Sequence, residues 1–317
     1  MLKIHFINVA EGDATLIEYF NLDRIVRILV DTGRSYISED KDSVHLRAAE
    51  YLRKNGVDYL DDVIITHLHV DHSAGLTDVL QTVKVGNLYS SYFPKDITLR
   101  VRETPDAGQH VYELQHDLNA FAANLQAMEK NGTEFHYCLN NRTLLDTEDF
   151  ILKILTADET SVAEQNLIYD EMYEHINLPG ELRYWASEVR NPNSMRVDIT
   201  YAGRRILIEG DYLGTYTEEE KSCPCDILKV THHGDAKTFA NGGMRMQLGS
   251  HAVISCQRQY VPKKDRPSKK VADLYRERGS SIYYTDSFAE PGHAAIKREA
   301  LVFTITDEGE ILAPQAN

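Results

Sequence analysis

Three observations predict that this chain of 317 residues folds as one α/β domain. Short apolar runs rich in β-branched residues recur along the sequence, bounded by Gly and Asp as strands usually are. Segments with apolar residues at helical spacing separate many of these runs. Several runs end in clusters of His and Asp, and an α/β fold usually carries its site at strand ends. Because 42% of the residues are hydrophobic, the chain can bury a sizeable core.

The N-terminal part is expected to begin with a β-meander. Its strands are Leu2–Val9, Ala14–Tyr19 and Arg24–Val30, and a buried strand follows at Val63–Thr66. Helices are expected at His45–Lys54, Leu76–Val85 and Val111–Lys130. The segment 86–130 is expected to begin with a tyrosine-containing loop. Asp31, after the third strand, either lines a site or caps its turn.

The C-terminal part is expected to add a second group of strands. They are Phe150–Thr156, the hairpin Arg196–Tyr201 and Arg204–Ile208, Ile227–Val230, Val253–Ser255, Ser281–Tyr284 and Leu301–Thr306, with a helix at Ser268–Arg278. We expect helical insertions in the single domain at about 105–132 and 158–190. The second insertion is acidic and aromatic, and it is either a lid over the site or a packed excursion.

The charge and the N-terminus restrict the function classes. With 49 acidic against 34 basic residues, the net charge is −15, which disfavours indiscriminate binding to polyanions but allows a local basic groove. We find no signal peptide and no apolar stretch that approaches a membrane span, so a cytoplasmic location is expected. The four cysteines are then free thiols, although Cys223-Pro224-Cys225 could be half of a metal site.

The segment Thr66–His72 is the strongest functional signal. It holds three histidines and an aspartate within six residues, at His67, His69, Asp71 and His72. Imidazole suits zinc and similar divalent metals, and a carboxylate adds an oxygen ligand. In an extended segment His67 and His69 point to one side, and a bend at Val70 can aim Asp71 and His72 at a second point. The pattern favours a metal site over a solvated polar loop.

Two later clusters also follow apolar strands. Asp211 comes after the strand Arg204–Ile208, and His232-His233 comes after Ile227–Val230. Strand ends at one edge of a sheet can converge, so the three clusters together could supply two metal positions. A carboxylate between two cations usually holds them about 3.5–4 Å apart.

These motifs resemble those of the metallo-β-lactamase-fold hydrolases. The resemblance rests on His-x-His-x-Asp-His at 67–72, on Gly210-Asp211 and on His232-His233. It narrows to the hydrolase domain of the competence protein ComEC and its soluble relatives through Val9–Ala14, Asn191–Ser194, Ile208–Asp211 and Leu228–Gly234. The resemblance implies a four-layer αββα sandwich. It does not reach the membrane-spanning part of ComEC, so it implies no DNA translocation.

The resemblance also implies a ligand set. His67 and His69 would hold the first metal, Asp71, His72 and His232 the second, and Asp211 would bridge them. His232 is preferred to His233 because family members with a single histidine have it in that register. Asp71 and Asp211 are the implied catalytic residues, and the substrate-binding candidates are His233, Asn193, Ser194, Lys237 and Arg266.

Two departures from the family pattern bear on this ligand set. Many members have a further histidine for the first metal, where this chain has Asn191–Ser194, so Asn193 or water could complete that site. ComEC-like chains tend to have His-Pro where this chain has Arg266-Pro267. The replacement of that histidine by Arg266 either removes a proton donor or adds a ligand for phosphate.

The predicted reaction is hydrolysis with two divalent metal ions, Zn²⁺ or Mn²⁺. A water bridging the metals becomes hydroxide near neutral pH and attacks the substrate, while Asp71 orients it and takes its proton. The segment Arg258–Arg278 carries eight basic and three acidic residues, which is typical of a phosphate-binding surface or of an ordinary charged helix.

This charge pattern and the resemblance favour a phosphodiesterase or nuclease, whose substrate is single-stranded nucleic acid or a nucleotide. The alternatives are an ester, thioester or lactone hydrolase on the same metals, and a non-catalytic metal-binding regulatory module. Turnover by the metal-loaded protein would exclude the regulatory module.

Overall fold

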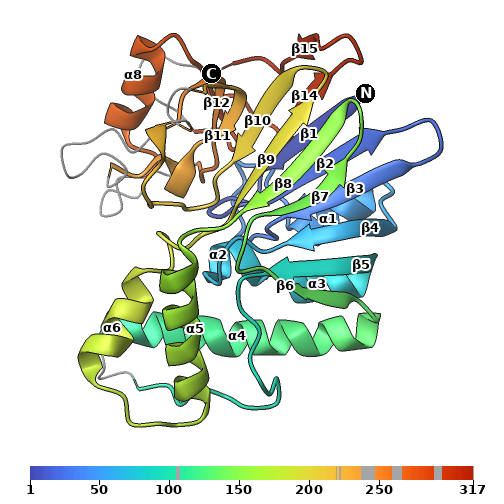
Figure 1. Cartoon of the computed structure of the whole chain (residues 1–317). Coiled ribbons are helices and arrows are strands. Elements are labelled where there is room, and N and C mark those ends of the chain that lie inside the picture. Colours follow the sequence, from blue (N-terminus) through green and yellow to red (C-terminus); the bar gives the residue numbers. More distant parts are fainter. Residues whose placement is uncertain are drawn as a thin grey trace.

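Two mixed β-sheets packed face to face form the centre of the computed structural model (Figure 1). The structure describes residues 1–104, 108–218, 220, 223–236, 247–258, 266–288 and 295–316. Within these residues, the first sheet has the strand order β15-β14-β1-β2-β3-β4-β5-β6 and the second the order β13-β12-β11-β10-β9-β8-β7.

The strands of the two sheets are short. Those of the first sheet are β1 (Leu2–Ile7), β2 (Thr15–Phe20), β3 (Ile25–Val30), β4 (Tyr59–Ile64), β5 (Lys84–Ser90), β6 (Glu134–Tyr137), β14 (Ala300–Ile305) and β15 (Ile311–Leu312). Those of the second are β7 (Arg142–Asp146), β8 (Phe150–Leu155), β9 (Arg196–Tyr201), β10 (Arg204–Ile208), β11 (Cys225–Lys229), β12 (Gly249–Ile254) and β13 (Ser281–Tyr284).

Helices cover the outer faces of both sheets. They are α1 (Ala48–Lys54), α2 (Val70–Ser73), α3 (Leu76–Thr82), α4 (Gln109–Asn131), α5 (Glu159–Tyr173), α6 (Gly180–Glu188) and α8 (Lys269–Glu277), and a short 3₁₀ turn η2 spans Thr231–Gly234. None of the described helices combines the length and the apolar character that crossing a membrane requires.

Three separate hydrophobic clusters define four layers. Ile4 of β1 and Ile206 of β10 belong to the cluster between the sheets. Leu29 of β3 points to the opposite face, where the first sheet meets the helices, and Val271 belongs to a third cluster between the second sheet and α8. Successive side chains of a strand point to opposite faces, so each sheet supplies two of these interfaces. The predicted α/β class and αββα layering are confirmed.

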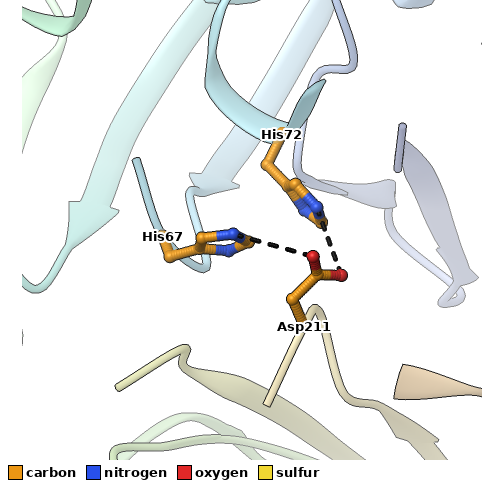
Figure 2. A group of neighbouring side chains, drawn as sticks. All are labelled: His67, His72 and Asp211. Atoms are coloured by element: carbon orange, nitrogen blue, oxygen red, sulfur yellow. Dashed lines mark ion pairs between the residues drawn. The ribbon is translucent and has the colours of Figure 1, made fainter. Parts of the chain in front are cut away.

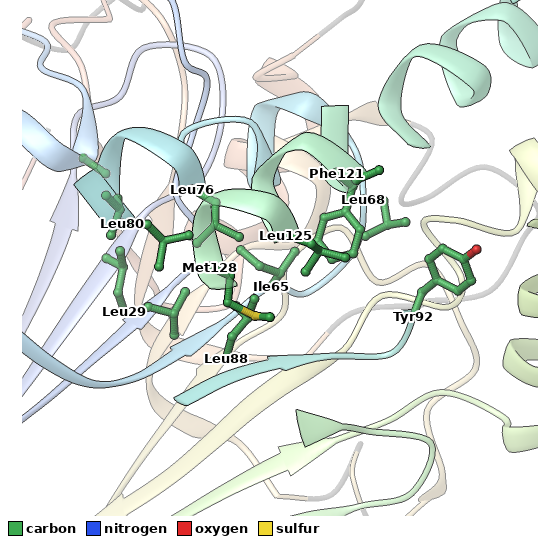
Figure 3. Close-up of a cluster of buried hydrophobic side chains, with 14 of the residues drawn as sticks. Leu29, Ile65, Leu68, Leu76, Leu80, Leu88, Tyr92, Phe121, Leu125 and Met128 are labelled. Carbon is green, nitrogen blue, oxygen red and sulfur yellow. The ribbon is translucent and has the colours of Figure 1, made fainter. Parts of the chain in front are cut away.

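The long helix α4 packs on the first sheet through one face. Its apolar side chains Leu114, Leu118, Phe121, Leu125 and Met128 recur at intervals of three and four residues, and all are buried. Figure 3 shows Phe121, Leu125 and Met128 in the cluster between this helix and the sheet. Gly132 ends the helix in the left-handed conformation, with φ 73°. The helix predicted over Val111–Lys130 is confirmed.

The helices α5 and α6 pack beside α4 (Figure 1). Tyr169 and Tyr173 of α5 are buried in the same cluster as α4, and the Tyr173 hydroxyl donates a hydrogen bond to the carbonyl oxygen of Leu118. Buried Arg190, just after α6, pairs with buried Asp117 of α4. The segment 158–190 therefore packs against α4 through buried side chains of α5 and through Arg190.

One strand was predicted as loop. Lys84–Ser90 forms β5, so the tyrosine-containing loop expected from residue 86 begins only after it, and the preceding helix ends at Thr82 instead of Val85. Gly86 interrupts the strand pattern of this segment. A Cβ at this position would lie 2.7 Å from the carbonyl oxygen of Asp61 on β4. Glycine inside a strand often marks such a close approach of another backbone.

A charged cluster across β1, β2 and β3 predicts a pH dependence of stability. The carboxylate of Glu18 on β2 lies 3.2 Å from His5 Nε2 and 2.9 Å from Arg27 Nε. His5, with the larger effect, and Arg27 lower the pKa of Glu18 from 4.5 to about 2, although partial burial acts to raise it. A carboxyl whose folded pKa is depressed stabilises the fold above its unfolded pKa, and this contribution is lost as the pH falls toward the folded value.

Glu18→Gln is therefore expected to lower the free energy of unfolding at pH 6 by up to about 3 kcal/mol. The difference from the wild-type protein should shrink steadily between pH 5 and pH 3, as measured by urea unfolding at each pH. A difference that stays constant over this range would contradict the assignment.

Candidate metal centre

The candidate site lies where several strands end. Asp13 follows β1 in the turn that leads to β2, Asp31 follows β3, and His67 and His69 follow β4. From the second sheet, Asp211 follows β10 and the histidine pair of η2 follows β11. The strands β10 and β11 are parallel neighbours, as are β3 and β4, so their carboxyl ends lie at the same edge.

Several of these residues have an uncommon backbone conformation. Asp31, His232 and His233 have φ values of 58°, 49° and 52°, in the left-handed region that residues other than glycine seldom occupy. Such conformations cost free energy and persist only where the surrounding structure holds them. The strain falls on three residues of the candidate site.

Asp211 lies between histidines from two parts of the chain. Its Oδ1 is 3.3 Å from His72 Nε2 and 3.5 Å from His233 Nε2. Its Oδ2 is 3.9 Å from His67 Nε2 and 3.8 Å from His232 Nε2. Figure 2 shows His67 and His72 approaching this carboxylate from the first sheet. The two oxygens thus face two different pairs of histidines, which is the position expected for a bridging carboxylate.

The potential ligand atoms form four overlapping groups within the described part of the chain. In each group the atoms lie within 4.8 Å of one another, and every member is buried. The groups are His67, His72 and Asp211; Asp71, His72 and His233; Asp13, Asp211 and His233; and Asp13, Asp31 and His72.

The unsatisfied polar atoms of this cluster fit a bound cation. Among the described residues, His72 Nε2, His233 Nε2 and Asp211 Oδ1 are buried and form no hydrogen bond. Buried polar atoms normally have a partner, and leaving one without any costs about 1–3 kcal/mol. Three such atoms pointing at one another, with nitrogen and oxygen donors, are a suitable site for a divalent metal.

His67 and His69 are neighbours, and of the two only His67 belongs to one of the four groups. His67 Nε2 is 2.7 Å from His69 Nδ1. Burial lowers the pKa of both imidazoles well below 6.5, so both are neutral at pH 7 and keep a lone pair for a metal. On its other side, His67 Nδ1 lies 3.2 Å from Thr66 Oγ1 and 3.4 Å from Ser194 Oγ, which orient the ring.

His72 is oriented by Asp31. Its Nδ1 is 2.8 Å from Asp31 Oδ2, and Asp31 also accepts hydrogen bonds from the backbone N–H and the hydroxyl of Thr66. This arrangement turns His72 Nε2 toward Asp211. Burial alone would lower the pKa of His72, but the charges of Asp211 and Asp31 raise it well above 6.5. Asp31 therefore lines the site, which was one of its two predicted alternatives.

His233 occupies a more central position than His232. Its Nε2 is 3.5 Å from Asp71 Oδ2 and equally close to Asp211, and it belongs to two of the four groups. Burial would raise the pKa of Asp71, but the nearby imidazoles of His233 and His72 and the positive charge of Arg34 hold it well below 3.8. His232 belongs to none of the groups and faces the Oδ2 side of Asp211, toward Asn191 Nδ2 at 3.4 Å.

Sequence reasoning missed Asp13 and Lys229. Asp13 lies 3.7 Å from His72 Nδ1 and 3.6 Å from His233 Nδ1, and it pairs with Lys229, whose side chain is only 1% exposed. Lys229 also donates a hydrogen bond to the carbonyl oxygen of Gly210. A lysine at the end of strand β11, between the apolar residues Leu228 and Val230, was the available signal, because lysine is almost never fully buried without a partner.

The predicted substrate-binding residues occupy different surroundings. Ser194 lies behind His67 and accepts a hydrogen bond from the backbone N–H of Asp211. The Asn193 amide bonds Gln165 and Ser161 of α5, whereas Asn191 faces His232. Arg266 lies near Asp235 and Glu11, and Lys237 is outside the described residues.

Many charges of the basic segment 258–278 are paired with acids. Arg258 binds Asp40, and both Lys269 and Arg276 lie beside Asp273 on α8. Lys263 and Lys264 are outside the described residues. Helix α8 thus resembles an ordinary charged helix. Arg266 lies near the turn η2, with its Nε 3.6 Å from Asp235 Oδ2.

Gly210 allows Asp211 to reach the cluster. It has φ 52°, and a Cβ there would lie 2.6 Å from Ser194 Oγ and 2.8 Å from Thr66 Oγ1. Gly210→Ala is expected to lower the free energy of unfolding by about 2–4 kcal/mol, from left-handed strain plus overpacking. The matched control is Gly203→Ala, with φ 74° and open space around the new Cβ, where only about 1–2 kcal/mol should be lost. Equal losses in urea unfolding would contradict this account.

The comparison with known proteins agrees with this architecture. Residues 12–144 match the model of the Metallo-beta-lactamase superfamily, a region that includes Asp13, Asp31 and His67–His72. The chain has the metallo-beta-lactamase fold. No curated protein sequence matches it.

Solved structures with this fold resemble the chain at low sequence identity. The short form of human tRNase Z is 14% identical, with 96% of this chain and 100% of that chain covered and a TM-score of 0.43. The metallo-beta-lactamase-fold protein YhfI from Bacillus subtilis is 13% identical, with 89% and 95% covered and a TM-score of 0.45. A diphosphatase of the PhnP family is 9% identical, with 90% and 86% covered and a TM-score of 0.41.

Proposed function

We propose that the protein is a metal-dependent hydrolase of phosphodiesters, with a pair of divalent ions held around Asp211. The observation that carries the proposal is the position of this carboxylate, whose two oxygens face two separate pairs of histidines. The match to the Metallo-beta-lactamase superfamily supports the same chemistry.

On this geometry we assign the ligands to two positions. His67, His69 and Asp211 would hold the first metal, and Asp71, His72, His233 and Asp211 the second. We favour His233 over His232 for the second position because His233 Nε2 faces both Asp71 and Asp211. His232 lies on the side of Asp211 Oδ2, and its Nε2 is 3.4 Å from Asn191 Nδ2. The Oδ1 of Asn191 is buried and forms no hydrogen bond among the described residues. Either can supplement the first position, which lacks the family's third histidine.

The residues around the pair have distinct roles in the proposed reaction. Bound divalent ions supply Lewis acidity, which activates a water nucleophile near neutral pH and neutralises charge on the phosphoryl oxygens. Asp71 remains ionised and is the candidate base that orients the water and takes its proton. Asp31 fixes the His72 ring, and Thr66 and Ser194 fix His67, so the ligands are oriented before substrate binds.

Phosphodiesters are favoured over esters, thioesters and lactones by the charge at the edge of the site. Arg34 and Arg266 both lie beside Glu11, in the turn that packs on the histidine loop, and Arg266 Nε is 3.6 Å from Asp235 at the end of η2. Positive groups beside the cluster favour a substrate that carries negative charge, whereas a neutral acyl substrate gains less from them.

A substrate panel tests the proposal. Protein loaded with zinc or with manganese is assayed on bis(p-nitrophenyl) phosphate, a thymidine dinucleotide, a cyclic nucleotide, an acyl-homoserine lactone and a thioester. We expect turnover of the phosphodiesters at a kcat/KM at least tenfold above that of the acyl substrates. Turnover of the lactone or thioester alone would replace the proposal with acyl hydrolysis, and no turnover at all would favour a regulatory module.

A further inference from the structure

Glu11 lies directly beside the metal centre. It follows Ala10, with φ 60°, and precedes Gly12, with φ 136°, in the turn between β1 and β2. A Cβ on Gly12 would lie 2.3 Å from the carbonyl oxygen of Asp71, and the N–H of Asp13 donates to that same oxygen. This turn therefore packs against the histidine loop, and Glu11 is carried at its edge with a side chain 24% exposed.

Two arginines reach Glu11 from different parts of the fold. Arg34 follows Gly33, whose N–H donates to the carbonyl oxygen of Asp13. Arg266 precedes Pro267, which lies against Gly234 at the end of the turn η2. Arg34 Nη2 is 3.4 Å from Glu11 Oε2, and Arg266 Nη2 is 3.7 Å from Glu11 Oε1.

These contacts are long, and so is the third one that Arg266 makes, a separation of 3.6 Å between its Nε and Asp235 Oδ2. Charge-assisted N–H···O bonds are usually about 2.7–2.9 Å long, so both separations from Glu11 exceed a good hydrogen bond. The Nε atoms of Arg34 and Arg266 are also buried, and neither forms a hydrogen bond to any described residue. A guanidinium has five N–H donors in a planar fork that matches the oxygens of carboxylates and phosphates.

We propose that Arg34 and Arg266 form a subsite for a second, terminal phosphate of the substrate, and that Glu11 occupies it when no substrate is bound. The Glu11 carboxylate shows that an oxyanion fits between the two arginines. A terminal phosphate carries about two negative charges and three oxygens, so it can use donors that a carboxylate leaves free.

This inference rests on the proposed function and names its substrate class: a phosphodiester whose end carries a phosphate, such as a 5′-phosphorylated oligonucleotide. The net charge of −15 would repel a long polyanion from most of the protein surface. A short substrate that is recognised by one pair of arginines beside the site avoids this repulsion. The backbone on both sides of Glu11 is already in the positive-φ region, so the turn presents Glu11 at the edge of the cluster.

The test compares a thymidine dinucleotide with and without a 5′-phosphate on the metal-loaded protein. We expect kcat/KM for the phosphorylated dinucleotide to be higher by about tenfold or more. In the variant Arg34→Met/Arg266→Met the two substrates should become equal, and Glu11→Gln should lower KM for the phosphorylated one by removing the internal competitor. The matched control is Arg204→Met, since Arg204 pairs with Asp226 at the opposite end of β10.

Binding of inorganic phosphate to the chelator-treated protein, measured by calorimetry, separates this inference from the proposed function. Phosphate binding that is lost in the double arginine variant supports the subsite even if no hydrolysis is found. Equal hydrolysis of the two dinucleotides, with phosphate binding unchanged in that variant, overturns the subsite and leaves the phosphodiesterase standing.

Discussion

Replacement of Asp211 by alanine is expected to lower kcat/KM on a phosphodiester by at least about 10³-fold, or about 4 kcal/mol of transition-state stabilisation. The carboxylate is buried, and each of its oxygens faces two histidines. Its removal takes one ligand from both proposed metal positions. The bound metal, measured by mass spectrometry of the acid-digested protein, should fall together with the activity.

The control for this variant is Asp198→Ala, which removes a carboxylate from β9 that pairs with Arg205. It should keep its metal and its activity. Thermal unfolding of the metal-free proteins shows whether Asp211→Ala still folds, since four neighbouring imidazoles lose the carboxylate that they face. A folded Asp211→Ala variant with wild-type turnover would contradict the proposed centre.

Lys229→Met is expected to destabilise the metal-free protein by about 3–5 kcal/mol. Lys229 is almost fully buried in β11, where it pairs with Asp13 and donates to the carbonyl of Gly210. Its removal leaves the buried Asp13 carboxylate without its cation. Removing one partner of a buried ion pair lowers the stability more than removing both, because the remaining buried charge is then uncompensated.

The double variant Asp13→Asn/Lys229→Met should therefore recover much of that loss, and urea unfolding in the presence of a chelator measures all four proteins of the cycle. If the two single substitutions and the double variant lose equal amounts, or if Lys229→Met costs less than about 1 kcal/mol, the pair does not support the centre as described.

The sequence was sufficient to predict the elements with strong patterns. The hairpin at Arg196–Ile208, the strand Ser281–Tyr284 and the amphipathic face of α4 lie where apolar periodicity and turn residues predicted them. The strands β5, β6, β7 and β15 were missed. They are edge strands or contain glycine or many polar residues, so their pairing depends on neighbours distant in the chain.

The residues of the candidate site also divide into those that the local sequence predicts and those that depend on distant parts of the chain. Residues with metal-binding chemistry, such as His67 and Asp211, could be recognised from type and spacing alone. The positions of Asp13 and Lys229 could not, because they depend on the packing of β1 and β11 around the histidine loop. The choice between His232 and His233 also depends on backbone conformation, since both have positive φ and point to different sides of Asp211.

The most direct test of the proposed metal centre is a titration of chelator-stripped protein with zinc or manganese, in which bound metal and hydrolysis of bis(p-nitrophenyl) phosphate are followed together. We predict that activity appears with metal, saturates at about two ions per chain and is lost again with chelator. Protein that binds no metal with micromolar affinity, or that hydrolyses the diester equally well when stripped, would contradict the account.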